Sequence, residues 1–151
     1  MIPILPRAFP LLVLLVSLTT PAMAAKKSYG DIDGAVYLSN PDGDTLRMNI
    51  PGVPPLLGEN ISIRIRGVDT PEIRGLCPRE KQLAQEASRQ VHHLLASAGH
   101  ITLKDVGRDK YFRIVATVLA DEVDVGAMLL NKGLATPYDG GHKTKKWCES
   151  P

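Results

Sequence analysis

The chain has 151 residues, of which 44% are hydrophobic and 23% are charged. This length suits one domain with its own hydrophobic core. The near balance of 18 basic and 16 acidic side chains excludes a polycation that binds nucleic acid through bulk charge, so any recognition of phosphate must be local.

The first 24 residues differ from the rest of the chain. They hold one charged residue, Arg7, then an apolar run at 9–18 and a small-x-small sequence at 22–24. This order predicts a secretory signal peptide at 1–24, because the run is too short for a comfortable membrane span; an uncleaved anchor is the alternative. Residues 25–151 would then form an exported domain, periplasmic or secreted, with a net charge of +1 and no stable membrane association.

The predicted elements begin with three strands. Strands at 34–38 and 45–50 flank the turn sequence Asn-Pro-Asp-Gly-Asp at 40–44, so they form a hairpin. Three prolines and two glycines predict a loop at 51–58. Isoleucines then alternate with polar residues at 61–66, which indicates a half-buried strand with arginines on its outer face.

The second half of the chain is predicted to hold two helices with two strands between them. Its elements are a helix at 79–98 with Pro78 in its first turn, a strand at 101–104, a turn at 107–110, a long strand at 111–119, a short helix at 125–132 and a polar tail. The order predicts an α+β, mainly β fold: a five-stranded OB-fold barrel with an inserted helix and a short second helix.

The two cysteines, Cys77 and Cys148, favour a disulfide, because an exported protein with an even number of cysteines usually pairs them. Closing a loop of this length would contribute on the order of 4 kcal/mol by the chain-entropy estimate. Two cysteines cannot build a zinc site alone, and the four histidines lack ligand spacing. They are His92, His93, His100 and His142.

Two groups of side chains are candidates for a functional site. Oxygen ligands that suit Ca²⁺ or Mg²⁺ stand at the ends of neighbouring strands, namely Asp42, Asp44, Asp69 and Glu72. Planar donors that suit a phosphate are Arg64 and Arg113. Each piece alone has a plainer interpretation as a turn, a cross-strand partner or a solvated strand. Their joint occurrence in this order favours a site for a phosphate and a hard cation.

Together these pieces resemble the thermonuclease, or staphylococcal-nuclease-like, family. The matching sequences are DGDT at 42–45, RxRGVDTPE at 64–72, DKYxR at 109–113 and NKGLA at 131–135. The stretch at 69–87 and the closing YDGG…WC resemble an exported, cysteine-bearing branch of that family. The resemblance implies an OB-fold and Ca²⁺-dependent endonuclease hydrolysis of phosphodiester bonds in DNA and RNA. Substrate would be single-stranded or frayed, because bases that stack on tyrosines need no groove.

The resemblance also implies a cation site. Asp44 and Asp69 would bind Ca²⁺ through their carboxylates, and Thr70 through its backbone carbonyl. Asp42 would stand behind these ligands as a supporting acid. Glu72 would act as the general base or orient the attacking water.

Other residues would hold the substrate. Arg64 and Arg113 would bind the phosphate, most strongly in the transition state. Three residues match positions that contact the nucleotide in the family, namely Lys110, Tyr111 and Tyr138.

The chain departs from the family pattern at two places. Phe112 stands where the family usually has glycine, and its ring would either re-aim Arg113 or pack on the barrel. The family's extended C-terminal helix is missing, and a bridge between Cys77 and Cys148 would hold the short tail instead. A non-catalytic OB-type nucleic-acid-binding module and a purely structural exported domain are the alternatives to the enzyme. We expect a monomer.

Overall fold

A computed structural model describes residues 27–143 and 147–149. The predicted signal peptide at 1–24 lies outside these residues. Among the helices of the described part, none has both the length and the apolar character that crossing a membrane requires.

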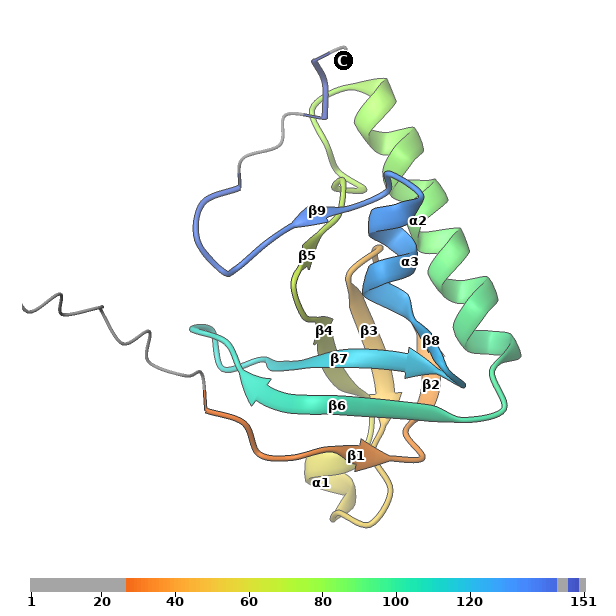
Figure 1. Ribbon diagram of the computed structural model, residues 1–151, viewed down its shortest axis with the longest axis vertical. Coiled ribbons are helices and arrows are strands. Elements are labelled where there is room, and N and C mark those ends of the chain that lie inside the picture. The colour runs from red at the N-terminus through yellow and green to blue at the C-terminus, as the bar shows by residue number, and fades with distance from the viewer. Residues whose placement is uncertain (1–26, 144–146, 150–151) are drawn as a thin grey trace, which may run out of the picture.

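A sharply bent sheet forms the body of the molecule (Figure 1). Its strands are β1 (Ile32–Asp33), β2 (Val36–Ser39), β3 (Thr45–Asn49), β4 (Ile61–Ile65), β6 (Ile101–Arg108), β7 (Ile114–Ala120) and β8 (Val123–Asp124). They pair in the order β1-β6-β7-β4-β3-β2, with β8 on β7. The pairing of β4 with β7 is parallel, and the sheet turns there, so that β6 and β7 cross the direction of β3 and β4.

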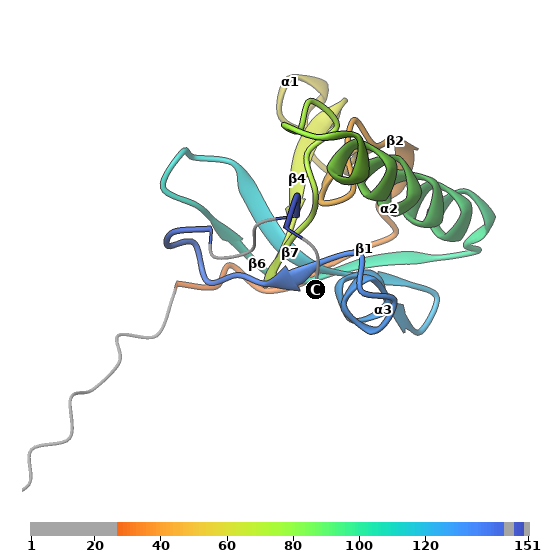
Figure 2. The ribbon, with the colours of Figure 1, turned by 90° about the horizontal axis from the view of Figure 1, so that it is seen from above.

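The long helix α2 (Pro78–Ser97) lies along one side of this sheet, and the short helix α3 (Val125–Asn131) lies beside it (Figures 1 and 2). Pro78 occupies the first helical turn, where its missing N–H costs nothing. Fully buried small side chains at helical spacing, such as Ala84, Ala87 and Val91, let α2 pack closely on the barrel. In α3 the carboxylate of Asp124 caps the amide of Ala127 at 3.0 Å.

The predicted fold class is therefore confirmed: a mainly β, OB-fold-like barrel with an inserted helix and a short second helix. The structure adds elements that the sequence pattern did not predict. A single helical turn, α1 (Pro55–Gly58), interrupts the predicted loop at 51–58. The tail strand β9 (Thr136–Pro137) pairs with β5 (Val68–Asp69) in a separate two-stranded sheet.

The long strand predicted at 111–119 is wrong at its beginning, because β7 starts at Ile114. The carboxylate of Asp109 accepts hydrogen bonds from the amides of Tyr111 and Arg113, both at 2.9 Å. These bonds fold residues 109–113 into a turn, so a local side-chain acceptor overrides the β-propensity of the aromatic residues. The preceding strand is longer than the predicted 101–104, because β6 continues through an irregularity to Arg108. The predicted turn at 107–110 therefore begins later, after Arg108.

Gly43, inside the DGDT sequence, is where the hairpin turn touches α2. A Cβ atom added to Gly43 would lie 2.8 Å from Cβ of Ala87 and 2.9 Å from Cγ2 of Thr70. The glycine therefore allows a close approach between the turn, the helix and the acidic stretch that follows β4.

We predict that Gly43→Ala lowers the free energy of unfolding by about 1–3 kcal/mol, because the added methyl overpacks this contact. Urea denaturation monitored by circular dichroism measures the change. Gly99→Ala is the matched control, since the nearest atom to its added Cβ is Oδ1 of Asp121 at an ordinary 3.5 Å. Equal stability of the two variants would contradict the packing argument.

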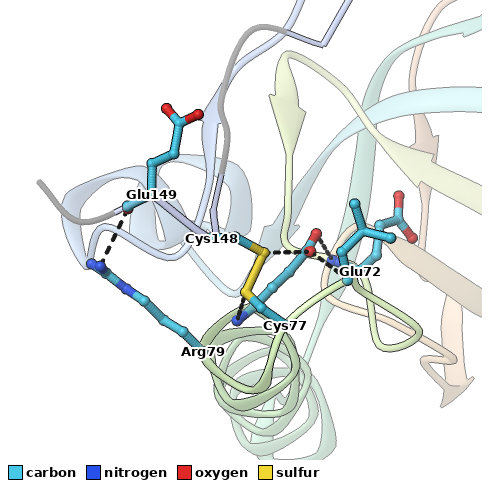
Figure 3. The surroundings of a disulfide bond; sticks show 7 residues. Glu72, Cys77, Arg79, Cys148 and Glu149 are labelled. Atoms are coloured by element: carbon cyan, nitrogen blue, oxygen red, sulfur yellow. Dashed lines mark hydrogen bonds between the residues drawn. A yellow bond between two sulfur atoms is a disulfide. The ribbon is translucent and has the colours of Figure 1, made fainter.

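The disulfide between Cys77 and Cys148 is confirmed, with Cα atoms 5.8 Å apart (Figure 3). It joins the residue that caps α2 to the end of the tail, next to the buried Trp147. Residues 71 positions apart are thereby linked, so the tail is held against the start of the helix.

We predict that the double variant Cys77→Ser, Cys148→Ser unfolds with a free energy lower by up to about 4 kcal/mol, because the unfolded chain regains its freedom. Serine keeps an acceptor at the helix N-cap, so the cap itself is preserved. Urea titrations with and without dithiothreitol check this. The reductant should lower the midpoint of the natural chain alone, and an unchanged natural midpoint would contradict the prediction.

Candidate active site

Arg64 is the centre of the candidate site, because it contacts both buried acids. The β3–β4 register sets Thr45 opposite Arg64, which brings the preceding Asp44 within reach of its guanidinium. Nη1 of Arg64 donates to Oδ1 of Asp44, and Nη2 lies 3.5 Å from Oδ1 of Asp69. The carbonyl of Val68 accepts a further bond from Nη2 at 3.0 Å. Two carboxylates and one guanidinium are thus packed together at the end of these strands.

The two acids are almost removed from solvent, with Asp44 5% and Asp69 3% exposed. Burying two carboxylates is costly unless positive charge and donors compensate. Oδ2 of Asp44 accepts the amide of Thr70 at 3.1 Å. Oδ1 of Asp69 has ion-pair contacts, but the described residues give it no hydrogen bond of good geometry.

This donor set suits a hard cation. Asp44 and Asp69 offer carboxylate oxygens, and the buried Thr70 adds a backbone carbonyl. Such ligands are those that Ca²⁺ prefers, and a cation would satisfy the buried oxygen of Asp69. Another cluster with metal-ligand spacing, Cys77, Glu80 and Cys148, does not compete, because both of its sulfurs belong to the disulfide.

Asp42 acts on this group through the backbone. Its Oδ1 accepts the amides of Asp44 at 3.0 Å and Thr45 at 2.7 Å, so it closes the turn that presents Asp44. Burial raises the pKa of the Asp42 carboxyl, and the nearby charge of Asp44 raises it further. Asp42 thus shapes the turn that carries Asp44, and its role as a supporting acid stays a prediction.

Glu72 lies at the outer edge of the group, where its side chain is 57% exposed. The buried Glu80 of α2 holds the loop that carries Glu72. Its carboxylate accepts hydrogen bonds from the backbone amides of Leu76 at 2.9 Å and Glu72 at 3.4 Å. A Cβ atom on Gly75 would lie 2.4 Å from Cδ of Glu80, so a larger residue there would displace this carboxylate. Figure 3 shows Glu72 near the disulfide that holds the start of α2.

Lys143, in the tail, is a residue that the sequence analysis missed. Its Nζ lies 3.0 Å from Oδ1 of Asp69 and 2.5 Å from Oε1 of Glu72, so it bridges the two acids. Partial burial alone would lower the pKa of the Lys143 ammonium, but its contacts with the carboxylates of Glu72 and Asp69 outweigh this and raise it. A basic tail was the only available signal, and nothing in it indicated this partner.

A cleft of about 540 Å³ opens beside the acidic group. Its basic and aromatic lining residues are Arg64, Arg66, Arg108, Lys110, Tyr111, Arg113 and Tyr138. The structure thus brings together both predicted phosphate ligands and all three predicted nucleotide contacts. Asp44, Asp69, Thr70 and Glu72 lie outside the lining of the cleft. Arg64, which lines it, contacts Asp44 and Asp69.

Cations and aromatic rings alternate in this cleft. The guanidinium carbon of Arg64 lies 5.4 Å from the ring centre of Tyr138. That of Arg113 lies 5.6 Å from Tyr111, whose ring also has Nζ of Lys110 at 5.2 Å. Asp109 holds Arg113 in place, since its Oδ2 accepts Nε at 2.7 Å. Such an alternation presents flat apolar faces and positive charge to one ligand.

Comparison with known proteins agrees with this geometry. The family described as "Staphylococcal nuclease homologue" matches residues 62–148. A probable endonuclease of Schizosaccharomyces pombe is 35% identical over 106 residues, which cover 62% of this chain and 45% of that protein. A probable endonuclease of Verticillium alfalfae is 37% identical over 125 residues, which cover 74% of this chain and 42% of that protein. The chain spans less than half the length of these curated relatives. With more than half of its residues matched, the chain belongs to the staphylococcal nuclease homologue family.

Proposed function

We propose that this protein is a Ca²⁺-dependent endonuclease that hydrolyses phosphodiester bonds of DNA and RNA. One observation carries the proposal: the buried acids Asp44 and Asp69 meet Arg64 at the edge of a cleft lined by arginines and tyrosines. An anionic phosphate in that cleft would contact cationic donors on one side and, on the other, a cation bound by the two carboxylates. Family membership and the names of the curated relatives support the same reaction.

The positions of the residues support the role proposed for each of them. A bound divalent cation would stabilise negative charge on the phosphate and acidify a water. Glu72, exposed at the edge of the acidic group, would accept the proton of that water. Arg113, partly exposed in the cleft, can donate to the phosphate oxygens, which carry more charge in the transition state. Arg64 holds the acids and faces the same phosphate.

The substrate preference follows from the aromatic rings. Tyr111 and Tyr138 line the cleft with faces on which any base can stack. A base must leave its duplex to do this, so single-stranded or frayed nucleic acid is the preferred substrate. The near-neutral net charge of the chain agrees with recognition by this local site rather than by a broad basic surface.

A second candidate function is a non-catalytic module that binds nucleic acid. The bridging position of Lys143 favours it, because an ammonium between Asp69 and Glu72 can replace a cation permanently. Such a protein would bind single strands in the cleft without cleaving them.

We also propose that the chain is exported to the periplasm or the medium after removal of residues 1–24. The disulfide supports this, because structural disulfides persist mainly in oxidising compartments.

The first test is nuclease activity, with Glu72→Gln as the diagnostic variant. Release of acid-soluble nucleotides from heat-denatured DNA is followed in Ca²⁺ and in chelator. We expect cleavage by the natural chain in Ca²⁺ alone, and roughly 10²–10⁴-fold slower turnover in Glu72→Gln, since the amide cannot accept a proton. The melting temperature should hardly change, because Glu72 is exposed. Binding without cleavage by the natural chain would favour the second candidate.

We predict that Lys143→Met lowers the Ca²⁺ concentration needed for half-maximal binding by several-fold, because the ammonium no longer competes for Asp69 and Glu72. Isothermal titration calorimetry with CaCl₂ measures this without any catalytic step. Lys104→Met, on an exposed position of β6, is the control. If neither protein binds Ca²⁺, the proposed cation site is wrong, and if both bind it equally, Lys143 does not compete.

A further inference from the structure

Phe112, at the tip of the turn between β6 and β7, has no role in the core. Its side chain is 76% exposed, and the neighbouring Tyr111 is 69% exposed. Of the two outcomes expected from the sequence, packing on the barrel is therefore wrong. Arg113 itself lines the cleft. Two adjacent exposed aromatic rings next to a basic cleft need another explanation.

The backbone does not favour a phenylalanine at this position. Phe112 has a φ of +67°, a left-handed conformation that glycine adopts freely and bulky residues rarely adopt. The turn imposes this angle, since the amide of Phe112 donates to the carbonyl of Asp109 at 3.0 Å. The ring thus has no part in the core, and its backbone conformation is an unfavourable one for phenylalanine. Side chains held in such conformations occur preferentially at functional sites.

Arg108 connects this ring to the cleft. Its guanidinium carbon lies 4.7 Å from the centre of the Phe112 ring, and its Nη1 donates to the carbonyl of Phe112 at 2.7 Å. Arg108 also lines the cleft. The pair repeats the combination of Tyr111 with Lys110 and Arg113, so two units of aromatic ring and cation follow each other along the turn.

We propose that Phe112 and Arg108 form an additional nucleotide subsite at the rim of the cleft. A base of single-stranded DNA or RNA stacks on Phe112, and the adjoining phosphate pairs with Arg108. The ring offers a face that suits any base, and the guanidinium supplies the charge that a backbone phosphate requires. The subsite rests on the proposed nucleic-acid-binding function and extends it by one nucleotide beyond the positions at Tyr111 and Tyr138.

The test exploits the left-handed backbone. Phe112→Gly removes the ring but suits the turn, so the positions of Asp109 and Arg113 are preserved. Fluorescence anisotropy in chelator, where a Ca²⁺-dependent enzyme leaves its probe intact, gives dissociation constants for labelled oligothymidylates of increasing length. We expect Phe112→Gly to bind the longer strands roughly tenfold more weakly. Oligonucleotides too short to reach the rim should bind to Phe112→Gly as tightly as they bind to the natural chain.

Two further measurements identify stacking as the cause. The dependence of the affinity on salt should stay unchanged in Phe112→Gly, because no phosphate contact is lost, whereas Arg108→Gln should reduce it. Phe112→Tyr should restore the affinity, since it restores the ring. An equal loss of affinity for single strands and for a blunt duplex would overturn base stacking.

The controls separate this inference from the function on which it rests. Leu56→Ala removes another exposed apolar side chain, in α1, and should leave binding unchanged. If the natural chain neither binds nor cleaves any strand, the proposed function fails, and the subsite fails with it. If the natural chain binds and cleaves while Phe112→Gly binds equally tightly and melts higher, only the subsite is refuted. The ring would then be a strained side chain without a ligand.

Discussion

The contact of Arg64 with Asp44 and Asp69 is the interaction on which the candidate site depends. Two acids that are each at most 5% exposed require compensating charge, because an unpaired buried carboxylate would be protonated or would destabilise the fold. The barrel supplies this charge through register, since pairing of β3 with β4 places Arg64 beside the hairpin turn. The same side chain faces the cleft, so the group that stabilises the acids is also available to a phosphate.

The tail completes the site from the other end of the chain. The amide of Tyr138 donates to the carbonyl of Gly67 at 2.9 Å, next to the pairing of β5 with β9. The disulfide anchors Cys148 at the start of α2, and between these two fixed points the tail delivers Lys143 to the acidic group. The attachments at Tyr138 and Cys148, on either side of Lys143 in the sequence, limit how far Lys143 can lie from the acidic group.

The turn between β6 and β7 shows a local constraint that serves the cleft. The carboxylate of Asp109 binds the amides of Tyr111 and Arg113 and the guanidinium of Arg113. These contacts orient two cleft residues and force Phe112 into a left-handed conformation. Strain at Phe112 is therefore a consequence of how the turn is closed, and the ring that carries it projects beside Arg108.

Elements with a local signal could be predicted from the amino-acid sequence. Helical spacing on α2 and alternation on β4 reflect one buried face each, and the acids and arginines at strand ends indicated where to expect a site. The cysteine count predicted the disulfide. Three features appear only in the three-dimensional structure: Lys143 bridges Asp69 and Glu72, Glu80 holds the loop of Glu72, and residues 109–113 form a turn. The first two depend on chain segments meeting in space, and the third on one carboxylate that outweighs the β-propensity of its neighbours.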